Sequence, residues 1–508
     1  MSRIAATSII ISGITLVNLA LLFFSTLVIA WKFGSGYNMD SFFAGITIPL
    51  FIVSIISGSL SFSFIPIFSK YKDSGEVWVI ANSFLNIVII TSIVFCLFGF
   101  MYADQIIDIT NPGFDQKQVA LTSHILQIAL PLIVFSSINE LMASVFYAHG
   151  YFFLPAVNKL INPSLIIGII YFFGDDFGID SLAYAMLVSS LTQTIFLFVN
   201  YSRNKKFHYK FETKLNNKGV RNIINLMLPL VAGMFVYRAM PIYDKIFLSY
   251  LSAGSISYIT YSQKLLHSIP AIVSTGIAVT TFPLMSEDFV NNKIKELRVI
   301  VSKAIRVIFF VTVPLMVFLF NFGEGFIVLM FEHGAFESDD TIGVYRAFAI
   351  YVIALPAMTA GAIIGQSYYA MHDTITASII GVVEVCFYII FCYSMIPYFG
   401  YLTIPVGFVL YHYMGLVVNG FIIRRKMKSL GGKGVIKSFA VCLFISLLSL
   451  SMIIALQQLT HYDGDILYFI FSILIYIFIS NNIVKTEEAR MNVDKFKGLM
   501  NAKKILNK

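Results

Sequence analysis

The sequence predicts an all-α polytopic membrane protein with about fourteen transmembrane helices. Of the 508 residues, 58% are hydrophobic and only 12% are charged, and the mean hydropathy is +0.83. A water-soluble globule could not cover its surface with this composition. Apolar stretches of roughly 20 residues, long enough to span a bilayer as a helix, recur along the chain. They show no strict apolar–polar alternation, which favours helices over strands.

The apolar stretches are spread over nearly the whole chain. The first, Ile9 to Ala30, is longer than a typical signal-peptide core and lacks a convincing cleavage site, so we expect it to be a transmembrane helix. The predicted helices centre near residues 20, 54, 88, 134, 163, 191, 236, 270, 311, 356, 386, 411, 445 and 474.

The loops between these stretches alternate in charge. Because Lys and Arg accumulate on the cytoplasmic side, the alternation predicts both termini in the cytoplasm and an even number of spans. The net charge of +8 is therefore a topology signal, and nucleic acid is not an expected partner. Basic segments are Lys70–Lys72, Arg203–Arg221, Lys293–Arg306, Arg424–Lys437 and Lys485–Lys508. Acidic or neutral ones are Asp104–Asp115, Asp175–Asp180, Glu324–Asp340 and Asp463–Asp465.

One arrangement occurs twice, about 220 residues apart. Leu130-Pro131 leads to His149-Gly150, and Leu355-Pro356 leads to His372-Asp373. Duplicated bundles are typical of transporters, with the substrate site between the halves. We therefore predict two six-helix lobes related by a pseudo-two-fold axis, plus two extra C-terminal helices. The predicted segments are an N-lobe 1–202, a basic cytoplasmic linker 203–221, a C-lobe 222–424, two helices in 425–484 and a cytoplasmic tail 485–508.

The sequence lacks a nucleotide-binding motif, which limits the possible energy sources for transport. The nearest approach to a phosphate-binding GxxxxGK[ST] loop, around Lys433, is followed by Gly434. Neither the four cysteines nor the eight histidines have metal-site spacing, so no metal or resident cofactor is expected. Transport is expected to use a membrane potential, a substrate gradient, or Na⁺ or H⁺ as the coupling ion.

Ionisable residues within spans are the candidate functional residues, since a charge at the bilayer centre costs at least about 2.5 kcal/mol. Arg238 and Lys245 are seven residues apart and should share a helix face, with Pro241 kinking the helix between them. Lys264 and His267 should share another face. The alternatives are that Asp244 and Lys245 extend to the headgroups at the helix end, and that the polar face around Lys264 is a helix-packing seam.

These candidates are expected to serve two roles. A wet, cationic chamber between the lobes would suit a phosphorylated sugar head, whereas buried acids would bind a coupling ion. The predicted substrate-binding residues are Arg238, Lys264, Lys32, Asp40, Lys159 and His267. The predicted ion-coupling residues are Asp244, Glu384 and Glu140.

Several motifs together resemble the MurJ/MviN family of lipid II flippases, within the multidrug/oligosaccharidyl-lipid/polysaccharide exporter superfamily. They include Phe33-Gly34-Ser35-Gly36 followed by Asp40, Phe331-Glu332-His333-Gly334-Ala335-Phe336, and Tyr369-Ala370-Met371-His372-Asp373-Thr374. The resemblance implies fourteen helices in the bacterial inner membrane, alternating access, and a polyprenyl-tail groove formed by the last two helices. A polyprenyl-linked glycan lipid, membrane lipids and envelope-glycan synthesis enzymes are the implied partners.

The sequence departs from the family pattern at positions that usually carry charge. Leu19 and Ser25 stand where the family has arginines, Ser57-Gly58 replaces a Glu-Gly step, and Lys264 replaces an arginine. Lysine lacks the fork that grips a diphosphate. The departures favour another lipid-linked oligosaccharide, such as an O-antigen, capsule or exopolysaccharide unit moved by a Wzx-type flippase, over lipid II.

Two further functions remain as alternatives. A MATE-like cation-coupled drug exporter would usually have twelve spans. A membrane glycosyltransferase would need a catalytic carboxylate or metal site beside a large loop, and the acidic pairs in Asp104–Asp108 and Asp175–Asp176 are better explained as solvated loop charges. We therefore predict a non-enzymatic flippase.

Overall fold

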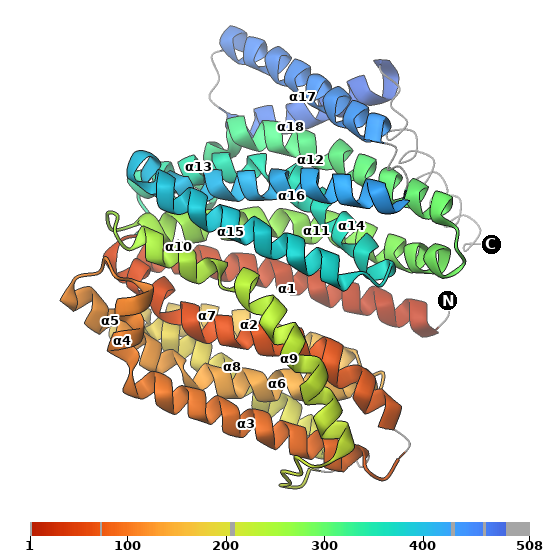
Figure 1. Cartoon of the computed structure of the whole chain (residues 1–508). Helices are drawn as coiled ribbons and strands as arrows, with labels where there is room; N and C mark the ends of the chain where they lie inside the picture. Colours follow the sequence, from red (N-terminus) through yellow and green to blue (C-terminus); the bar gives the residue numbers. More distant parts are fainter. Residues whose placement is uncertain (1–2, 72–73, 204–208, 428–431, 461–463, 484–508) are drawn as a thin grey trace. The chain divides into compact units, whose positions relative to one another are not determined.

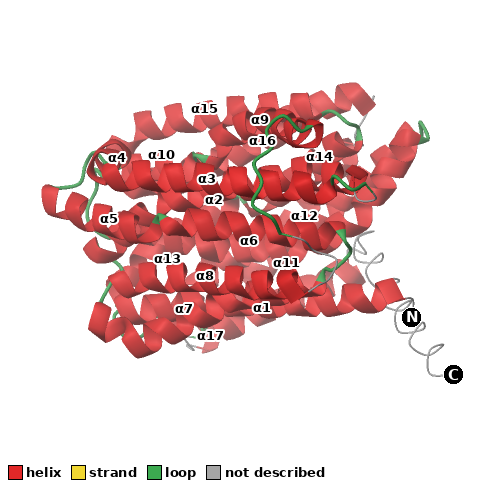
Figure 2. Cartoon of the chain, turned by 90° about the horizontal axis from the view of Figure 1, so that it is seen from below, coloured by secondary structure: helices red, strands yellow, loops and turns green. Residues whose placement is uncertain are grey.

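The fold was examined in a computed structural model that describes residues 3–71, 74–203, 209–427, 432–460 and 464–483. Every regular element in these ranges is helical, and no strand occurs in them (Figures 1 and 2). The bilayer core offers no water to the backbone, so a long apolar segment that crosses it must form its own backbone hydrogen bonds, as a helix does. The predicted all-α fold class is confirmed. The predicted tail 485–508 lies outside the described residues.

The helices follow one another with short connections. The first ten are α1 (Arg3–Phe33), α2 (Tyr37–Tyr71), α3 (Val77–Met101), α4 (Ala103–Thr110), α5 (Gln116–Ala129), α6 (Pro131–Ala148), α7 (Phe153–Phe177), α8 (Asp180–Arg203), α9 (Lys218–Arg238) and α10 (Met240–Leu248). The rest are α11 (Ser255–Val290), α12 (Ile294–Phe331), α13 (Ser338–Ile353), α14 (Leu355–Ala370), α15 (Thr374–Phe399), η1 (Gly400–Leu402), α16 (Thr403–Met427), α17 (Gly432–Thr460), α18 (Asp465–Phe478) and η2 (Ile479–Ile483).

Each of the fourteen predicted centres falls inside one of these helices. By length and composition, the described residues contain 11 segments able to cross a membrane, or up to 12 when the bent pair α13 and α14 counts as one span. The chain is thus a multi-pass membrane protein, and the number fourteen stays a prediction.

The sequence duplication reappears in the helices. Leu130-Pro131 separates α5 from α6, and Leu355-Pro356 lies at the 47° bend between α13 and α14. The long helices α2 and α11 have 35 and 36 residues, and each contains two prolines. Gly178 and Gly400, which end α7 and α15, have nearly identical backbone angles: φ 52° and ψ −136° against φ 55° and ψ −139°. Corresponding positions therefore fold alike in the two halves.

The chain forms two compact units whose boundaries differ from the predicted linker. Unit 1 comprises residues 1–258 and 333–340, and unit 2 comprises residues 259–332 and 341–508. Helices α9 and α10, predicted in the C-lobe 222–424, belong to unit 1 because α9 packs along α2 and Ser249, directly after α10, meets Gly113. The N-lobe and C-lobe boundaries, which were inferred from the sequence duplication, therefore remain a prediction.

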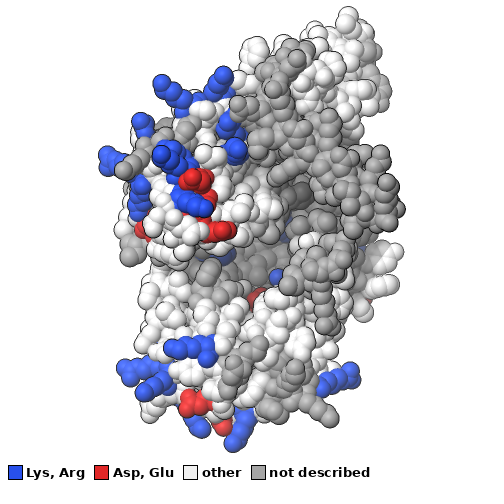
Figure 3. Space-filling view, turned by 90° about the vertical axis from the view of Figure 1, so that its right-hand side faces the viewer, with Lys and Arg blue, Asp and Glu red and all other residues white. Residues whose placement is uncertain are grey.

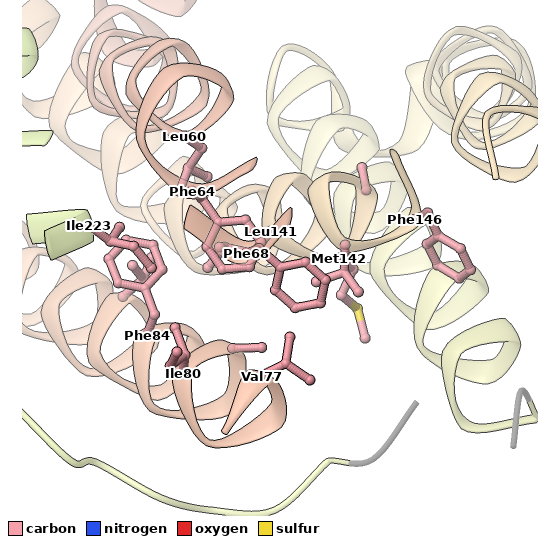
Figure 4. Close-up of a cluster of buried hydrophobic side chains, with 14 of the residues drawn as sticks. Leu60, Phe64, Phe68, Val77, Ile80, Phe84, Leu141, Met142, Phe146 and Ile223 are labelled. Carbon is pink, nitrogen blue, oxygen red and sulfur yellow. The ribbon is translucent and has the colours of Figure 1, made fainter. Parts of the chain in front are cut away.

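The core of unit 1 is an aromatic-rich cluster contributed mainly by α2, α3 and α6 (Figure 4). Phe64 and Phe84 stack at 5.7 Å between ring centroids, and Phe68 packs beside Phe64. Lipid tails are as apolar as these side chains, so close van der Waals packing rather than a hydrophobic drive holds the helices together. This cluster packs α2, α3 and α6 together, and the same helices carry polar residues described below.

The described part of the predicted linker lies against α3. The side chain of Asn86 donates to the carbonyl of Glu212 at 2.9 Å and accepts from the hydroxyl of Tyr209 at 3.0 Å. The backbone N–H of Lys214 donates to Ser83 at 3.1 Å. Residues 209–217 thus satisfy buried polar groups of α3. Residues 204–208 lie outside the described residues.

The two extra C-terminal helices pack on α12 within unit 2. The Arg306 side chain donates to the Ser438 hydroxyl at 2.8 Å, which links α12 to α17. The Tyr476 hydroxyl of α18 donates to the carbonyl of Phe310 at 3.0 Å. These polar contacts link α17 and α18 to α12.

Candidate functional site

Unit 1 carries a polar patch, which we define as Ser57, Gly58, Glu140, Lys159 and Arg238. The hydroxyl of Ser57 on α2 hydrogen-bonds to Glu140 on α6, and Lys159 on α7 attracts the same carboxylate. A Cβ placed on Gly58 would lie 3.8 Å from Nη2 of Arg238 on α9. Lys159 and Arg238 are exposed, whereas Glu140 is partly buried. Ser57 of α2 thus meets the Glu140–Lys159 pair of α6 and α7, and the next residue of α2, Gly58, lies against Arg238 of α9.

The polar patch is supported by amide side chains on the same helices. Asn158, beside Lys159, donates to the Asn139 carbonyl oxygen at 2.7 Å, and Gln193 of α8 donates to the backbone carbonyl of Asn158 at 3.0 Å. Hydrogen bonds between helices hold polar positions in register inside a membrane protein. They link α6, α7 and α8 next to Glu140 and Lys159 in the sequence.

The predicted kink at Pro241 coincides with a one-residue interruption between α9 and α10, which together still form one segment able to cross a membrane. Helix α9 ends at Arg238, and α10 begins at Met240 with Pro241 in its first turn. Arg238 is exposed, but Asp244 and Lys245 are only 3% and 5% exposed. The two cations therefore do not form one exposed face. The alternative that Asp244 and Lys245 reach the headgroups is also wrong, because both are buried.

Asp40 holds the start of α11. Its Oδ2 accepts the N–H of Gly254 at 2.7 Å, and its Oδ1 accepts the N–H and hydroxyl of Ser257 at 2.7 and 2.5 Å. Asp40 is 3% exposed, and Lys245 attracts it electrostatically. A carboxylate at a helix N-terminus satisfies unpaired N–H groups and the helix dipole. The predicted substrate-binding residue is thus engaged in a buried structural network.

Lys32 is tied to the end of α7. Its Nζ lies 2.5 Å from Oδ1 of Asp175, and its stem packs against Gly174. The Lys32 side chain is 16% exposed, whereas that of Asp175 is 87% exposed. The structure therefore does not bring Lys32 to the polar patch, and its predicted substrate role stays a prediction.

The loop that carries the Phe-Glu-His-Gly-Ala-Phe motif packs on the first glycine-rich turn. The N–H of Ala335 donates to the carbonyl of Trp31 at 2.8 Å, and the hydroxyl of Ser35 donates to Asp340. Gly34, at φ +59°, approaches the Ala335 carbonyl so closely that a Cβ would lie 2.2 Å from its oxygen. Two motifs 300 residues apart thus form one contact within unit 1.

Unit 2 holds the other three candidates. Lys264 and His267 on α11 are both exposed, as expected for residues on one face, and the His267 ring packs edge-on to Phe408 at 6.3 Å. Glu384 on α15 is 9% exposed and accepts a hydrogen bond from Asn419 of α16. The sequence reasoning missed Asn419, although an amide inside an apolar span was a usable signal.

Basic side chains gather at several helix ends. On the helix-end face seen in Figure 3, Lys and Arg side chains predominate over Asp and Glu. Helices α2, α8 and α16 all have basic last turns: Lys70, Arg203, and Arg424 with Arg425 and Lys426. By the loop rule, basic helix ends such as these are expected on the cytoplasmic side.

Comparisons with known proteins match nearly the whole chain. The family described as lipid II flippase MurJ matches residues 29–476. A probable lipid II flippase MurJ of Buchnera aphidicola subsp. Baizongia pistaciae is 29% identical over 84% of this chain and 83% of its own length. The lipid II flippase MurJ of Burkholderia cenocepacia is 23% identical over 78% of this chain and 80% of its own.

Solved structures share the fold. A lipid II flippase MurJ in an inward closed conformation has a TM-score of 0.81 at 23% identity, covering 93% of this chain and 98% of its own. An inward-facing multidrug transporter of the MATE family has a TM-score of 0.67 at 14% identity, covering 81% and 95%. Such identities establish the fold alone, whereas the family match covers most of the sequence. The chain therefore belongs to the MurJ family of lipid II flippases.

Proposed function

We propose that this chain flips lipid II, a polyprenyl-diphosphate-linked glycan, from the cytoplasmic to the outer leaflet of the bacterial inner membrane. The family match over residues 29–476 is the observation that carries the proposal. Movement between leaflets breaks no covalent bond, so the protein acts as a transporter and not as an enzyme. Both termini lie in the cytoplasm, in line with the basic loops.

Within unit 1, the exposed cations of the polar patch are the residues proposed to contact the diphosphate. Arg238 offers a planar fork of donors that suits phosphate oxygens, and Lys159 adds a point charge. Ser57 occupies the position where the family pattern has a glutamate. Glu140 is therefore the acid of the polar patch. Lys264 of unit 2 remains a proposed further contact.

Other parts of the family mechanism stay proposals for this chain. Helices α17 and α18 would hold the polyprenyl tail, and Na⁺ or H⁺ would couple transport to a gradient. Envelope-glycan synthesis enzymes would supply the substrate on one side and consume it on the other.

Complementation tests the function directly. Cells depleted of their own lipid II flippase should grow again when this chain is expressed. Expression without rescue, verified by the presence of folded protein in the membrane, would contradict lipid II as substrate.

A second candidate substrate is supported by Leu19 and Ser25, which stand at family arginine positions. Fewer cations favour a different lipid-linked oligosaccharide, such as an O-antigen, capsule or exopolysaccharide unit. Restored polysaccharide export in a strain that lacks a Wzx-type flippase, without rescue of lipid II transport, would establish this alternative.

Arg238→Ala is expected to weaken substrate binding by about 10–100-fold, because one charge-assisted contact contributes about 1.5–3 kcal/mol. Arg238→Lys should recover part of the loss, since it keeps the charge but not the fork. The measurement is binding of the lipid-linked substrate to purified protein in nanodiscs. The control is Arg203→Ala at the exposed end of α8, and equal effects of both alanine variants would remove Arg238 from the substrate site.

A further inference from the structure

The described part of the predicted linker, residues 209–217, carries large apolar side chains on its surface. We call these residues the strap. Tyr209, Phe211 and Leu215 are 46%, 69% and 58% exposed. Single exposed apolar residues are common on proteins, whereas several together mark a surface that meets a partner or a membrane. The strap is therefore a candidate contact surface of unit 1.

The strap has a fixed place on α3. Three hydrogen bonds to Asn86 and Ser83 hold it there, at 2.9 to 3.1 Å. At its end, the Asn217 side chain accepts the N–H of Gly219 at 2.8 Å and so caps α9, and its NH₂ group donates to Glu76 at 3.3 Å. The exposed side chains therefore project from a defined position on the helices.

That position is the edge of the lipid-facing surface of unit 1. On α3, Asn86 is 1% exposed, whereas exposed apolar side chains begin at Ile90 and continue to Met101. Asn86 and Ile90 are about 6 Å apart along the helix axis. On α8, Phe198 is 44% exposed, and its ring centroid lies 6.4 Å from that of Tyr209. The strap therefore continues the apolar surface of both helices at its edge.

Basic side chains alternate with the apolar ones. The side chains of Lys210 and Lys214 are 78% and 61% exposed, and their Nζ atoms lie 3.4 and 3.8 Å from the Glu212 carboxylate. Such exposed pairs are weak, so they leave the lysines available to another anion. Lys218 and Arg221, in the first turn of α9, are exposed as well. Residues 209–221 thus contain four basic residues and one acid.

We propose that the strap is a membrane anchor whose ligand is the anionic phospholipid of the surrounding bilayer. Tyr209, Phe211 and Leu215 enter the boundary between headgroups and acyl chains, and Lys210 and Lys214 contact lipid phosphates beside them. Apolar and basic side chains combined in one segment are typical of chains that lie in this boundary. By the loop rule the strap faces the cytoplasmic leaflet, whose surface is negative.

The observations favour lipid over an acidic protein as the partner. An acidic protein would meet the lysines, but Tyr209 packs against Phe198 on a lipid-facing helix surface, so the apolar side chains of the strap adjoin hydrocarbon. The lipid is bound as the solvent of the protein and not as cargo, so the inference does not rest on the proposed flippase function. Because the strap leads directly into α9, the anchor holds the start of the helix that carries Arg238.

Quenching of fluorescence by lipids brominated in their acyl chains tests the insertion, with the full-length protein in liposomes. Phe211→Trp should add emission that these lipids quench, measured as the difference from the wild type, which contains Trp31 and Trp78. Ser74→Trp is the matched control, because Ser74 is exposed in the turn that precedes α3 and should lie in water. An unquenched indole at position 211, or equal quenching in both variants, would overturn the anchor.

Hydrogen–deuterium exchange in the same liposomes tests the lipid class. Amides of the strap should exchange more slowly when phosphatidylglycerol is present than in phosphatidylcholine alone. The double variant Lys210→Gln with Lys214→Gln should lose this difference, because each lysine near an anionic surface contributes a factor of about five to binding. Lys70→Gln, at the exposed basic end of α2, should keep it.

Two results of the exchange experiment would overturn anionic lipid as the ligand. One is equal exchange of the wild-type strap with and without phosphatidylglycerol. The other is slower exchange on adding polyglutamate but not on adding phosphatidylglycerol, which would favour an acidic protein instead.

Discussion

Asp40→Ala is expected to lower the free energy of unfolding by roughly 3–5 kcal/mol, the cost of removing one partner from a buried charged network. Three hydrogen bonds from Gly254 and Ser257 would be lost, and buried Lys245 would lose an attracting charge. The first turn of α11 would then keep unsatisfied N–H groups. Thermal or denaturant unfolding in detergent, followed by circular dichroism, measures the change.

A second variant, Asp40→Asn, separates the effect of the Asp40 charge from the effect of its size. Asp40→Asn keeps the size, but its single carbonyl oxygen cannot accept from both Gly254 and Ser257, and its NH₂ group would face an N–H donor. We expect a large part of the alanine effect to remain. Asp175→Asn is the matched control: this carboxylate is 87% exposed in its pair with Lys32, and exposed pairs contribute only about 0–1 kcal/mol. Similar losses from both asparagine variants would contradict the role of Asp40.

Gly34→Ala is expected to release the 333–340 loop. A left-handed backbone costs a non-glycine residue about 1–2 kcal/mol, and overpacking adds about 1–3 kcal/mol. The added Cβ would lie 2.2 Å from the Ala335 oxygen, so the backbone must move and the bond from Ala335 to Trp31 must lengthen. Hydrogen–deuterium exchange of the Ala335 amide should rise by at least about tenfold, the change for 1.4 kcal/mol.

Gly36→Ala separates the two contributions. Gly36 also has a positive φ, +104°, but nothing lies within 4 Å of its Cβ position. This variant should show backbone strain without faster exchange at Ala335. Faster exchange in both variants would mean that the turn conformation, and not the close approach of Gly34 to the loop, holds residues 333–340.

Much of the fold was predictable because it depends on local patterns. Apolar runs of span length, prolines and glycines act on their own neighbourhood, so the breaks at Leu130-Pro131 and Leu355-Pro356 and the repeat were visible in the chain. The site was only partly predictable. Lys264 and His267 share an exposed face as their spacing requires. Packing buried Lys245 but left Arg238 exposed, and spacing along a helix does not predict that difference.

The all-helical membrane architecture and its internal duplication are properties of the amino-acid order, because solvent preference and backbone propensity act over a few residues. Tertiary packing decided the environment of each charge. It buried Asp40 against Gly254 and Ser257, paired Lys32 with Asp175, and enclosed Glu384 against Gly415. These contacts join residues that are 31 to 217 positions apart in the sequence. No local pattern specifies such distant partners, since they meet only when whole helices pack.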